Sequence, residues 1–228
     1  MSAAYDVDRA LQLNRERLRT VIPKRLQELR GGIDSSRDRL EAWRADLFIK
    51  MLLSVDRVCH DLLQTTEQEA LPAAAWNARN LLELLVWIKY CSASRANAWR
   101  FHEDALRDAL GLTESLSKMC ELAGVKNEFE ASARKKVDDL ALEKLGVKSI
   151  DSNYERVSNA AKCVGLDDLY NAWNKHLSKF AHPTALLVIG IMHQTGNLGD
   201  FQSVCTTDGV YLAGQCVIAL EQMIAAIP

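Results

Sequence analysis

Residues 72–91 read PAAAWNARNLLELLVWIKYC, and this stretch decides the fold. Apolar side chains occur on nearly every side of a helix built from it, so the helix lacks a polar face. Helices of that kind are usually covered on all sides by other elements. We therefore predict a helix over residues 72–91 at the centre of the protein.

Apolar residues recur at helical spacing on both sides of this central stretch. The clearest set predicts a helix over residues 36–63, with Ser35 and Asp38 as a capping box at its start. An earlier helix, interrupted at Pro23, is expected to end at Gly31-Gly32. The other predicted helices cover residues 94–122, 127–145, 152–164, 166–181, 185–192 and 209–227.

Regular strand patterns are almost absent, and only residues 201–205 are a candidate for a brief strand. Asp208 is expected to cap the last helix. The sequence therefore predicts an all-α fold, most simply an antiparallel helical bundle with long N-terminal helices. Within it, residues 1–32 are expected to form an N-terminal helix and residues 33–228 the bundle domain.

The composition narrows the class of protein. Hydrophobic residues make up 48% and charged residues 25% of the chain, which is ordinary for a globular protein. The formal net charge of -2 argues against a basic surface that covers duplex nucleic acid, and the basic residues of the first helix suit a solvated face. Six scattered cysteines without a C-x-x-C pair predict reduced, buried thiols and a cytoplasmic protein. Neither a signal peptide nor a membrane span is expected, because no run of about 20 apolar residues occurs.

The stretch KHLSKFAHP at residues 175–183 places chemically active side chains near the end of a predicted helix. Lys175, Ser178 and His182 are separated by three and four residues, so they share one helix face. Because a proline follows, His182 is expected to end the helix. A neutral histidine can move a proton while a nearby cation stabilises a phosphorane. The alternative is a histidine that hydrogen-bonds a carbonyl at the helix end, next to a solvated lysine.

Arg79 and Glu83 form a second candidate cluster, in the central helix. They are four residues apart and therefore neighbours on the helix surface. Removing one partner of a buried ion pair destabilises a protein by roughly 3–5 kcal/mol, so we predict an Arg79–Glu83 pair. This pair is either purely structural, or one of its members also faces a cleft shared with His182.

Neither a metal nor an organic cofactor is predicted. His176, His182 and His193 are the histidines that could gather around a metal, but no carboxylate lies near them at ligand spacing. The chain contains no H-E-x-x-H pattern, no phosphate-binding glycine loop and no G-x-S-x-G turn.

These motifs resemble those of the HEPN superfamily of all-α domains. The family motif is an arginine, then a polar residue, and then a histidine after four to six positions; Lys175, His176 and His182 resemble it here. The chain also resembles a group of HEPN-like bacterial proteins of unknown function, through ARNLLE at residues 78–83 and SKFAHP at residues 178–183. The likeness covers about residues 40–223.

Active HEPN domains are metal-independent ribonucleases that usually dimerise to form one composite site. The resemblance implies that His182 is the general base or acid and that Lys175 stabilises the phosphate. It leaves Arg79, Glu83 and Ser178 in supporting roles. Lysine replaces the family arginine here, and it offers a point charge in place of a bidentate fork.

The resemblance implies two alternative functions. The first is a homodimeric, metal-independent ribonuclease in a bacterial defence or toxin–antitoxin system. The second is a catalytically inactive HEPN-like module that binds RNA or an antitoxin-like protein, for which the N-terminal helix is the candidate surface. A helical bundle that binds a small molecule is a third, less favoured class.

Overall fold

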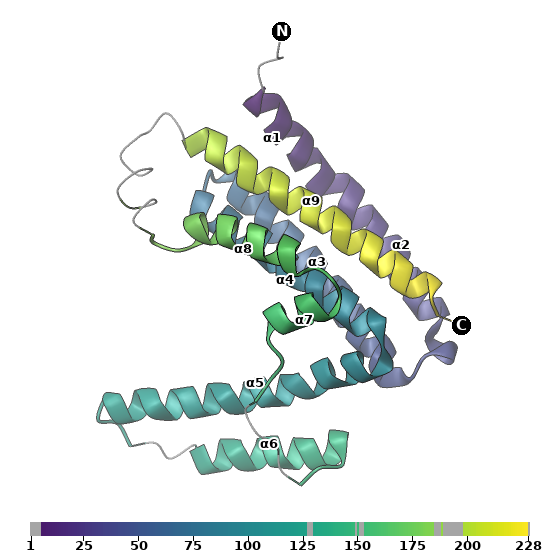
Figure 1. Cartoon of the computed structure of the whole chain (residues 1–228), viewed down its shortest axis with the longest axis vertical. Coiled ribbons are helices and arrows are strands. Elements are labelled where there is room, and N and C mark those ends of the chain that lie inside the picture. Colours follow the sequence, from purple (N-terminus) through teal and green to yellow (C-terminus); the bar gives the residue numbers. More distant parts are fainter. Residues whose placement is uncertain are drawn as a thin grey trace. The chain divides into compact units, whose positions relative to one another are not determined.

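A computed structural model of the protein describes residues 6–126, 130–148, 150, 153–184, 188 and 198–227. Every regular element in these residues is helical, which confirms the predicted all-α fold class (Figure 1). The α-helices are α1 (Val7–Glu16), α2 (Ile22–Ser35), α3 (Ala42–Glu67), α4 (Leu71–Ala93), α5 (Arg95–Leu122), α6 (Glu130–Leu145), α7 (Val157–Cys163), α8 (Asp167–Ala181) and α9 (Leu198–Ala225). A π-helical turn, η1 (Arg17–Val21), and a 3-10 turn, η2 (Arg37–Arg39), lie near the N-terminus.

The chain divides into two compact units. Residues 1–93 and 157–228 form the first unit, which contains α1–α4 and α7–α9. Residues 94–156 form the second unit, which contains α5 and α6. The predicted boundary between residues 32 and 33 falls inside the first unit, where α2 packs on both α3 and α9.

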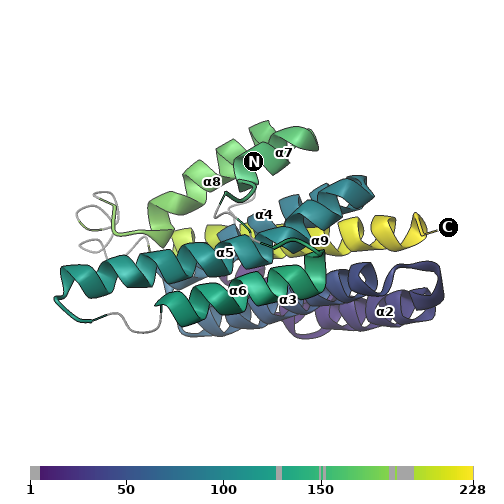
Figure 2. The same cartoon turned by 90° about the horizontal axis from the view of Figure 1, so that it is seen from below.

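The helix α4 is the centre of the first unit, as the sequence predicts. It packs against α3, α7, α8 and α9. In Figure 2, α4 and α9 lie between α7 and α8 on one side and α2 and α3 on the other. The fully buried side chains of α4 include Leu81, Leu82, Leu85 and Ile88. A strip that carries the exposed Trp76 and the half-buried Arg79 and Glu83 reaches solvent in the first half of the helix.

The helix α9 differs from its prediction, because it begins at Leu198. The predicted brief strand is therefore wrong, and Asp208 lies inside the helix and does not cap it. Polar side chains in the first half of α9 find partners on α3: Thr206 hydrogen-bonds Thr66, and Gln202 donates to the carbonyl of Thr65. Short polar side chains such as Thr206 disfavour a helix when they hydrogen-bond to nearby backbone groups. Here the side chain bonds to α3 instead, so the helix can continue through this segment.

Close packing makes α9 a core helix. A Cβ atom at Gly209 would lie 2.5 Å from a methyl carbon of Leu62 and 3.3 Å from the Cβ of Ala78, so a larger residue there would force the buried Leu62 side chain to shift. Within the described part of the chain, α9 is also the one helix long and apolar enough to cross a membrane. However, 61% of its most apolar window is buried inside the protein, and a buried core helix passes the same test.

The N-terminal helices α1, η1 and α2 run on without a break from residue 7 to residue 35. The predicted interruption at Pro23 takes the form of a π-helical turn just before the proline, which lies in the first turn of α2. A proline in the first turn removes no hydrogen bond that the new helix needs, and a π-turn relieves the crowding of the ring against the preceding carbonyls.

Two predicted signals between α2 and α3 are wrong. The helix does not end at Gly31-Gly32 but continues to Ser35, because Ile33 extends its apolar face and is fully buried. The capping box is also wrong, since residues 37–39 form a 3-10 turn and α3 begins only at Ala42. Burial of one apolar side chain outweighs the cost of a glycine in a helix, which is about 1 kcal/mol.

In the second unit, α6 packs along α5. Its small core consists of Leu110, Val137, Ala141 and Ile150. The start of α5 is fixed by Ser94, whose hydroxyl accepts a hydrogen bond from the backbone N–H of Asn97 at 3.0 Å. This helix therefore has the bounds that the sequence predicts.

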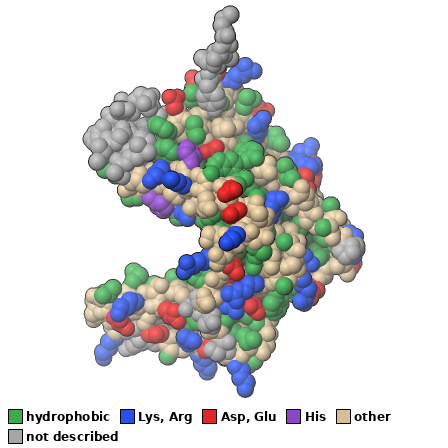
Figure 3. Space-filling view, viewed as in Figure 1, with side chains coloured by type: hydrophobic (Ala, Val, Ile, Leu, Met, Phe, Trp, Pro, Cys, Tyr) green, Lys and Arg blue, Asp and Glu red, His purple; other side chains and the backbone are tan. Residues whose placement is uncertain are grey.

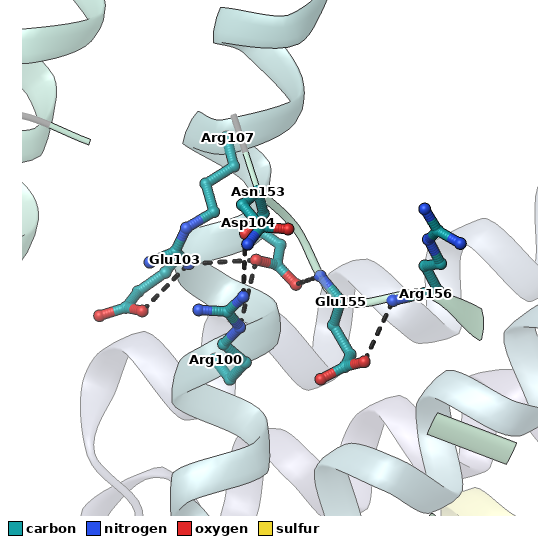
Figure 4. A network of polar contacts seen from close by, with 7 residues as sticks. All are labelled: Arg100, Glu103, Asp104, Arg107, Asn153, Glu155 and Arg156. Atoms are coloured by element: carbon teal, nitrogen blue, oxygen red, sulfur yellow. Dashed lines mark hydrogen bonds and ion pairs between the residues drawn. The ribbon is translucent and has the colours of Figure 1, made fainter. Parts of the chain in front are cut away.

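A charged network surrounds Asp104 in the second unit (Figure 4). The Asp104 carboxylate accepts hydrogen bonds from Arg107 Nη1 at 3.1 Å and from the backbone N–H of Glu155 at 3.0 Å. Arg100 Nε lies 3.6 Å from this carboxylate, and Arg100 Nη2 donates to the carbonyl of Asn153 at 2.9 Å. The network thus ties the segment that follows α6 to α5.

Candidate functional site

The helix α8 carries the stretch that the sequence marks as a candidate site. It packs against α4, and its buried side chains are Tyr170, Leu177 and Phe180. The helix ends at His182, whose backbone is extended with φ -119° and ψ 155°. Pro183 disfavours a helical backbone at the residue before it, so the predicted helix end is confirmed.

Arg79 of α4 is the centre of a polar cluster between α4 and α8. Its Nε donates to Asn174 Oδ1 at 2.8 Å, and its Nη1 lies 3.4 Å from His182 Nε2. Its Nη2 pairs with Glu83 Oε1 at 3.0 Å, so the predicted ion pair is present. Because each guanidinium nitrogen has its own partner, the planar group is held in one orientation. The side chains of Arg79 and Glu83 are 22% and 29% exposed, so the pair reaches solvent.

The guanidinium of Arg79 has only donors, so His182 Nε2 is the acceptor in the contact between these two side chains. The phenol of Tyr170 adjoins the cluster: burial raises its pKa, the charge of Glu83 raises it further, and Arg79 opposes both by its charge and a hydrogen bond.

An exposed tryptophan adjoins the polar cluster. The indole of Trp76 meets the His182 ring edge to face, with centroids 5.6 Å apart and an interplanar angle of 79°. Arg79 Cζ lies over the same indole, 5.5 Å from its centroid. Figure 3 shows histidine and basic side chains side by side on the surface near α8. We refer to Trp76, Arg79, Glu83, Asn174 and His182 as the Arg79 cluster.

The structure brings together three of the five residues that the sequence marks as a site, namely Arg79, Glu83 and His182. Lys175 is exposed and Ser178 is half-buried on α8, and within the described residues neither is a hydrogen-bond or ion-pair partner of Arg79. The reason is helical geometry: it is Asn174 that faces α4, and consecutive residues of a helix point about 100° apart.

The sequence patterns do not mark Asn174, Tyr170 or Trp76 as parts of a site. Asn174 lies four residues after Tyr170 and three before Leu177, on the apolar side of α8. An amide on a buried helix face needs a hydrogen-bond partner on the neighbouring element. That requirement is the signal that could have pointed to Asn174.

A second histidine on α8 has a carboxylate partner. His176 Nε2 lies 3.4 Å from Asp208 Oδ2 of α9. Burial raises the pKa of Asp208, and the charge of His176 partly offsets this effect. Within the described residues no three His, Cys, Asp or Glu side chains gather around a possible metal position, and His193 lies outside those residues.

The cysteines offer no activated nucleophile in the core. Burial is the main cause that raises the pKa of Cys59 and of Cys205 to about 12, so both thiols stay protonated at neutral pH. The six cysteines are all free, as predicted. The prediction that they are all buried is wrong for Cys163, which is exposed, and for Cys120, which is half-buried.

Comparison with known proteins adds no relative: no protein-family model, no curated protein and no solved structure matches this chain. The chemistry of the Arg79 cluster therefore has to be argued from its own geometry.

Proposed function

We propose that this protein is a HEPN-like ribonuclease that cleaves RNA at the Arg79 cluster without a metal ion. The observation that carries this proposal is the 3.4 Å contact between the guanidinium of Arg79 and the exposed imidazole of His182. A fixed cation next to an imidazole is the pair of groups that transfer of a phosphodiester to a neighbouring hydroxyl requires.

In the proposed reaction the 2′-hydroxyl of a ribose attacks the adjacent phosphorus. A bond forms between O2′ and phosphorus, the bond from phosphorus to the next O5′ breaks, and a 2′,3′-cyclic phosphate results. His182 takes the proton of the 2′-hydroxyl, the leaving O5′ takes a proton from a water molecule, and the proton on His182 returns to solvent. Arg79 donates hydrogen bonds to the non-bridging phosphate oxygens, where negative charge develops.

Binding of the phosphate also makes the proposed general base, His182, available for proton transfer. In the unbound protein the Nε2 lone pair of His182 accepts from Arg79 Nη1. A phosphate oxygen is a stronger acceptor for a guanidinium, because the hydrogen bond is then charge-assisted on both sides. When Nη1 turns to the phosphate, Nε2 becomes available for the proton. Asn174 keeps the guanidinium aligned during this exchange through its bond to Nε.

This assignment moves the phosphate-stabilising role from Lys175 to Arg79. The guanidinium of Arg79 can take the role of the arginine in the family motif. It comes from α4, whereas the motif residues Lys175 and His182 lie on α8 and at its end. Lys175 then contributes only to the general positive potential, because it is exposed and outside the cluster.

One observation favours the inactive alternative, an HEPN-like module that binds RNA or a protein without cleaving it. Glu83 pairs with Arg79 at 3.0 Å and offsets its charge. The basic N-terminal helices are likewise partly neutralised, since Arg19 pairs with Glu67 and Arg25 with Glu28 and Glu221. If a protein partner docks there, removing residues 1–30 will abolish its capture in a pull-down.

By the same resemblance we propose a homodimer that acts in a bacterial defence or toxin–antitoxin setting. Light scattering tests the oligomeric state: a dimer has twice the 25.5 kDa mass of one chain.

The deciding experiment is RNA cleavage in the presence of EDTA by the wild type and by His182→Ala. General acid–base catalysis contributes about 100-fold to 10,000-fold, so the variant should lose at least about 100-fold in rate. His60→Ala is the matched control, because His60 is an exposed histidine on α3 that bonds Gln64 and lies outside the cluster. Equal rates for His182→Ala and the wild type would exclude the enzymatic proposal.

A further inference from the structure

Trp76 is unusual among the five tryptophans of the chain. All five lie in the described residues, and Trp76 alone is exposed, with 44% of its surface accessible. A tryptophan gains stability by burial, so a large exposed indole in an otherwise well-packed helix is informative. The indole is also part of the Arg79 cluster, at 5.6 Å from the His182 ring and 5.5 Å from the Arg79 guanidinium.

We infer that Trp76 is a stacking platform for one unpaired base of a bound RNA, and that single-stranded RNA is therefore the ligand class of this site. This inference rests on the proposed function, since it assumes that the neighbouring Arg79 holds a phosphodiester. A phosphate at Arg79 and a base on Trp76 are one ribose apart within a nucleotide. Both groups thus act on the same or on adjacent nucleotides.

The geometry of the indole selects for unpaired bases. Arg79 lies over the ring, which leaves the exposed remainder of the indole for a ligand. In a duplex both faces of every internal base are covered by neighbouring bases, and an aromatic side chain can stack only on a base that has left the helix. Loops, bulges and single strands provide such bases, whereas a regular duplex does not.

The weak charge of the site makes stacking important. Arg79 shares its charge with Glu83, and the whole chain has a formal net charge of -2. Proteins that bind duplex nucleic acid rely on many phosphate contacts. Here one guanidinium and one indole provide most of the binding, so loss of the indole should lower the affinity for RNA strongly.

The test uses a short RNA single strand whose riboses are 2′-O-methylated, so that it binds without being cleaved. Its affinity for the wild type, Trp76→Leu and Trp76→Phe is measured by fluorescence anisotropy, next to a blunt duplex of the same sequence. We expect Trp76→Leu to weaken single-strand binding by at least about tenfold, and Trp76→Phe to retain most of it, because stacking on an aromatic ring is worth one to two powers of ten in affinity.

Trp99→Leu is the matched control. Trp99 lies in the second unit and contacts the ring of His102 at the same centroid distance, 5.6 Å, as Trp76 contacts His182. A general effect of losing a tryptophan beside a histidine would appear in both variants. Circular dichroism of each variant checks that the helices are intact. If Trp76→Leu is unstable, retained single-strand binding by Trp76→Phe still tests whether an aromatic ring at this position supports binding.

Cleavage and binding are read separately, so the two proposals can fail independently. Trp76-dependent binding without any cleavage supports the stacking role and ends the ribonuclease proposal. Cleavage of natural RNA with unchanged binding by Trp76→Leu supports the ribonuclease and overturns the stacking role. Tight binding of the duplex, or no binding of the single strand by the wild type, also overturns it. Where cleavage occurs, Trp76→Leu should raise KM by a larger factor than it lowers kcat.

Discussion

Arg79 in the first unit and Asp104 in the second each collect several polar partners, but their surroundings are opposite. Arg79 is a cation at the surface, next to an exposed histidine and an exposed indole. Asp104 is an anion with only 7% of its side chain accessible, enclosed by two arginines and a backbone N–H. The difference teaches that the number of polar contacts does not identify a binding site.

Accessibility and the type of group separate the two networks. The partners of Asp104 offset its charge and fix a chain segment. The Arg79 cluster combines a fixed cation with an imidazole, and both can be reached from solvent. We therefore expect substitutions in the first network to change activity and substitutions in the second to change stability.

The largest effect is expected for Arg79→Lys. Lysine keeps the charge, but it cannot bond Asn174, Glu83 and His182 at once, so the cation loses its fixed orientation. Loss of one oriented donor to a developing oxyanion reduces kcat by about 100-fold to 1,000-fold. The measurement is RNA cleavage, with Arg25→Lys on α2 as the control. Wild-type cleavage by Arg79→Lys would show that this contact has no part in catalysis.

Asp104→Ala is the counterpart in the second unit. Breaking a buried ion pair on one side destabilises a protein by about 3 kcal/mol. Native-state hydrogen exchange should show this loss for the amides of α5 and α6, and none for the amides of α4. Asp104→Asn should lose less, because its side chain still accepts from the backbone N–H of Glu155. Equal losses in both units would contradict the separation drawn between them.

Glu83→Gln tests the difference between the two networks. Glu83 offsets the charge of Arg79, as Arg100 and Arg107 offset the charge of Asp104, and the substitution removes this offset. Binding of the 2′-O-methylated single strand should tighten roughly fivefold, which corresponds to about 1 kcal/mol for a partly exposed ion pair. The pKa of Tyr170 should fall in the same variant, because the charge of Glu83 is one of its two raising causes. A titration of the tyrosine resonances checks this; a rise in that pKa would contradict the arrangement.

The smallest effect is expected for Lys175→Ala. Lys175 lies outside the Arg79 cluster, so cleavage should fall by less than about threefold, as it should for the control Lys179→Ala, another exposed lysine of α8. If Lys175→Ala instead reduces cleavage as much as Arg79→Lys does, the phosphate is held by α8, as the family resemblance implies.

Much of the fold could be predicted from the sequence, because the spacing of apolar residues in a long segment identifies it as a helix. The central position of α4 follows from its lack of a polar face, and the end of α8 at His182 follows from Pro183. The errors concern signals that depend on a neighbour. The glycine pair at residues 31–32, the polar start of α9 and the capping box before α3 each favour a local structure that packing overrides.

The candidate site was predictable only in part. The Arg79–Glu83 pair lies within one helix, where a four-residue spacing fixes the neighbours, and so the sequence alone indicated it. The partners Asn174 and His182 lie 95 and 103 residues further along the chain. The apolar pattern of α8 places Asn174 on its buried side, but it does not say which helix that side packs against.

The sequence by itself determined that this protein is helical, which helix is central, and that a histidine ends a helix before a proline. These properties depend on side chains a few residues apart and on the stereochemistry of single residues. Only the tertiary structure decided that the guanidinium beside His182 comes from α4 and that an exposed indole adjoins both. The rotation of α8 about its own axis sets that choice, and it depends on the sum of all contacts between α8 and the helices around it.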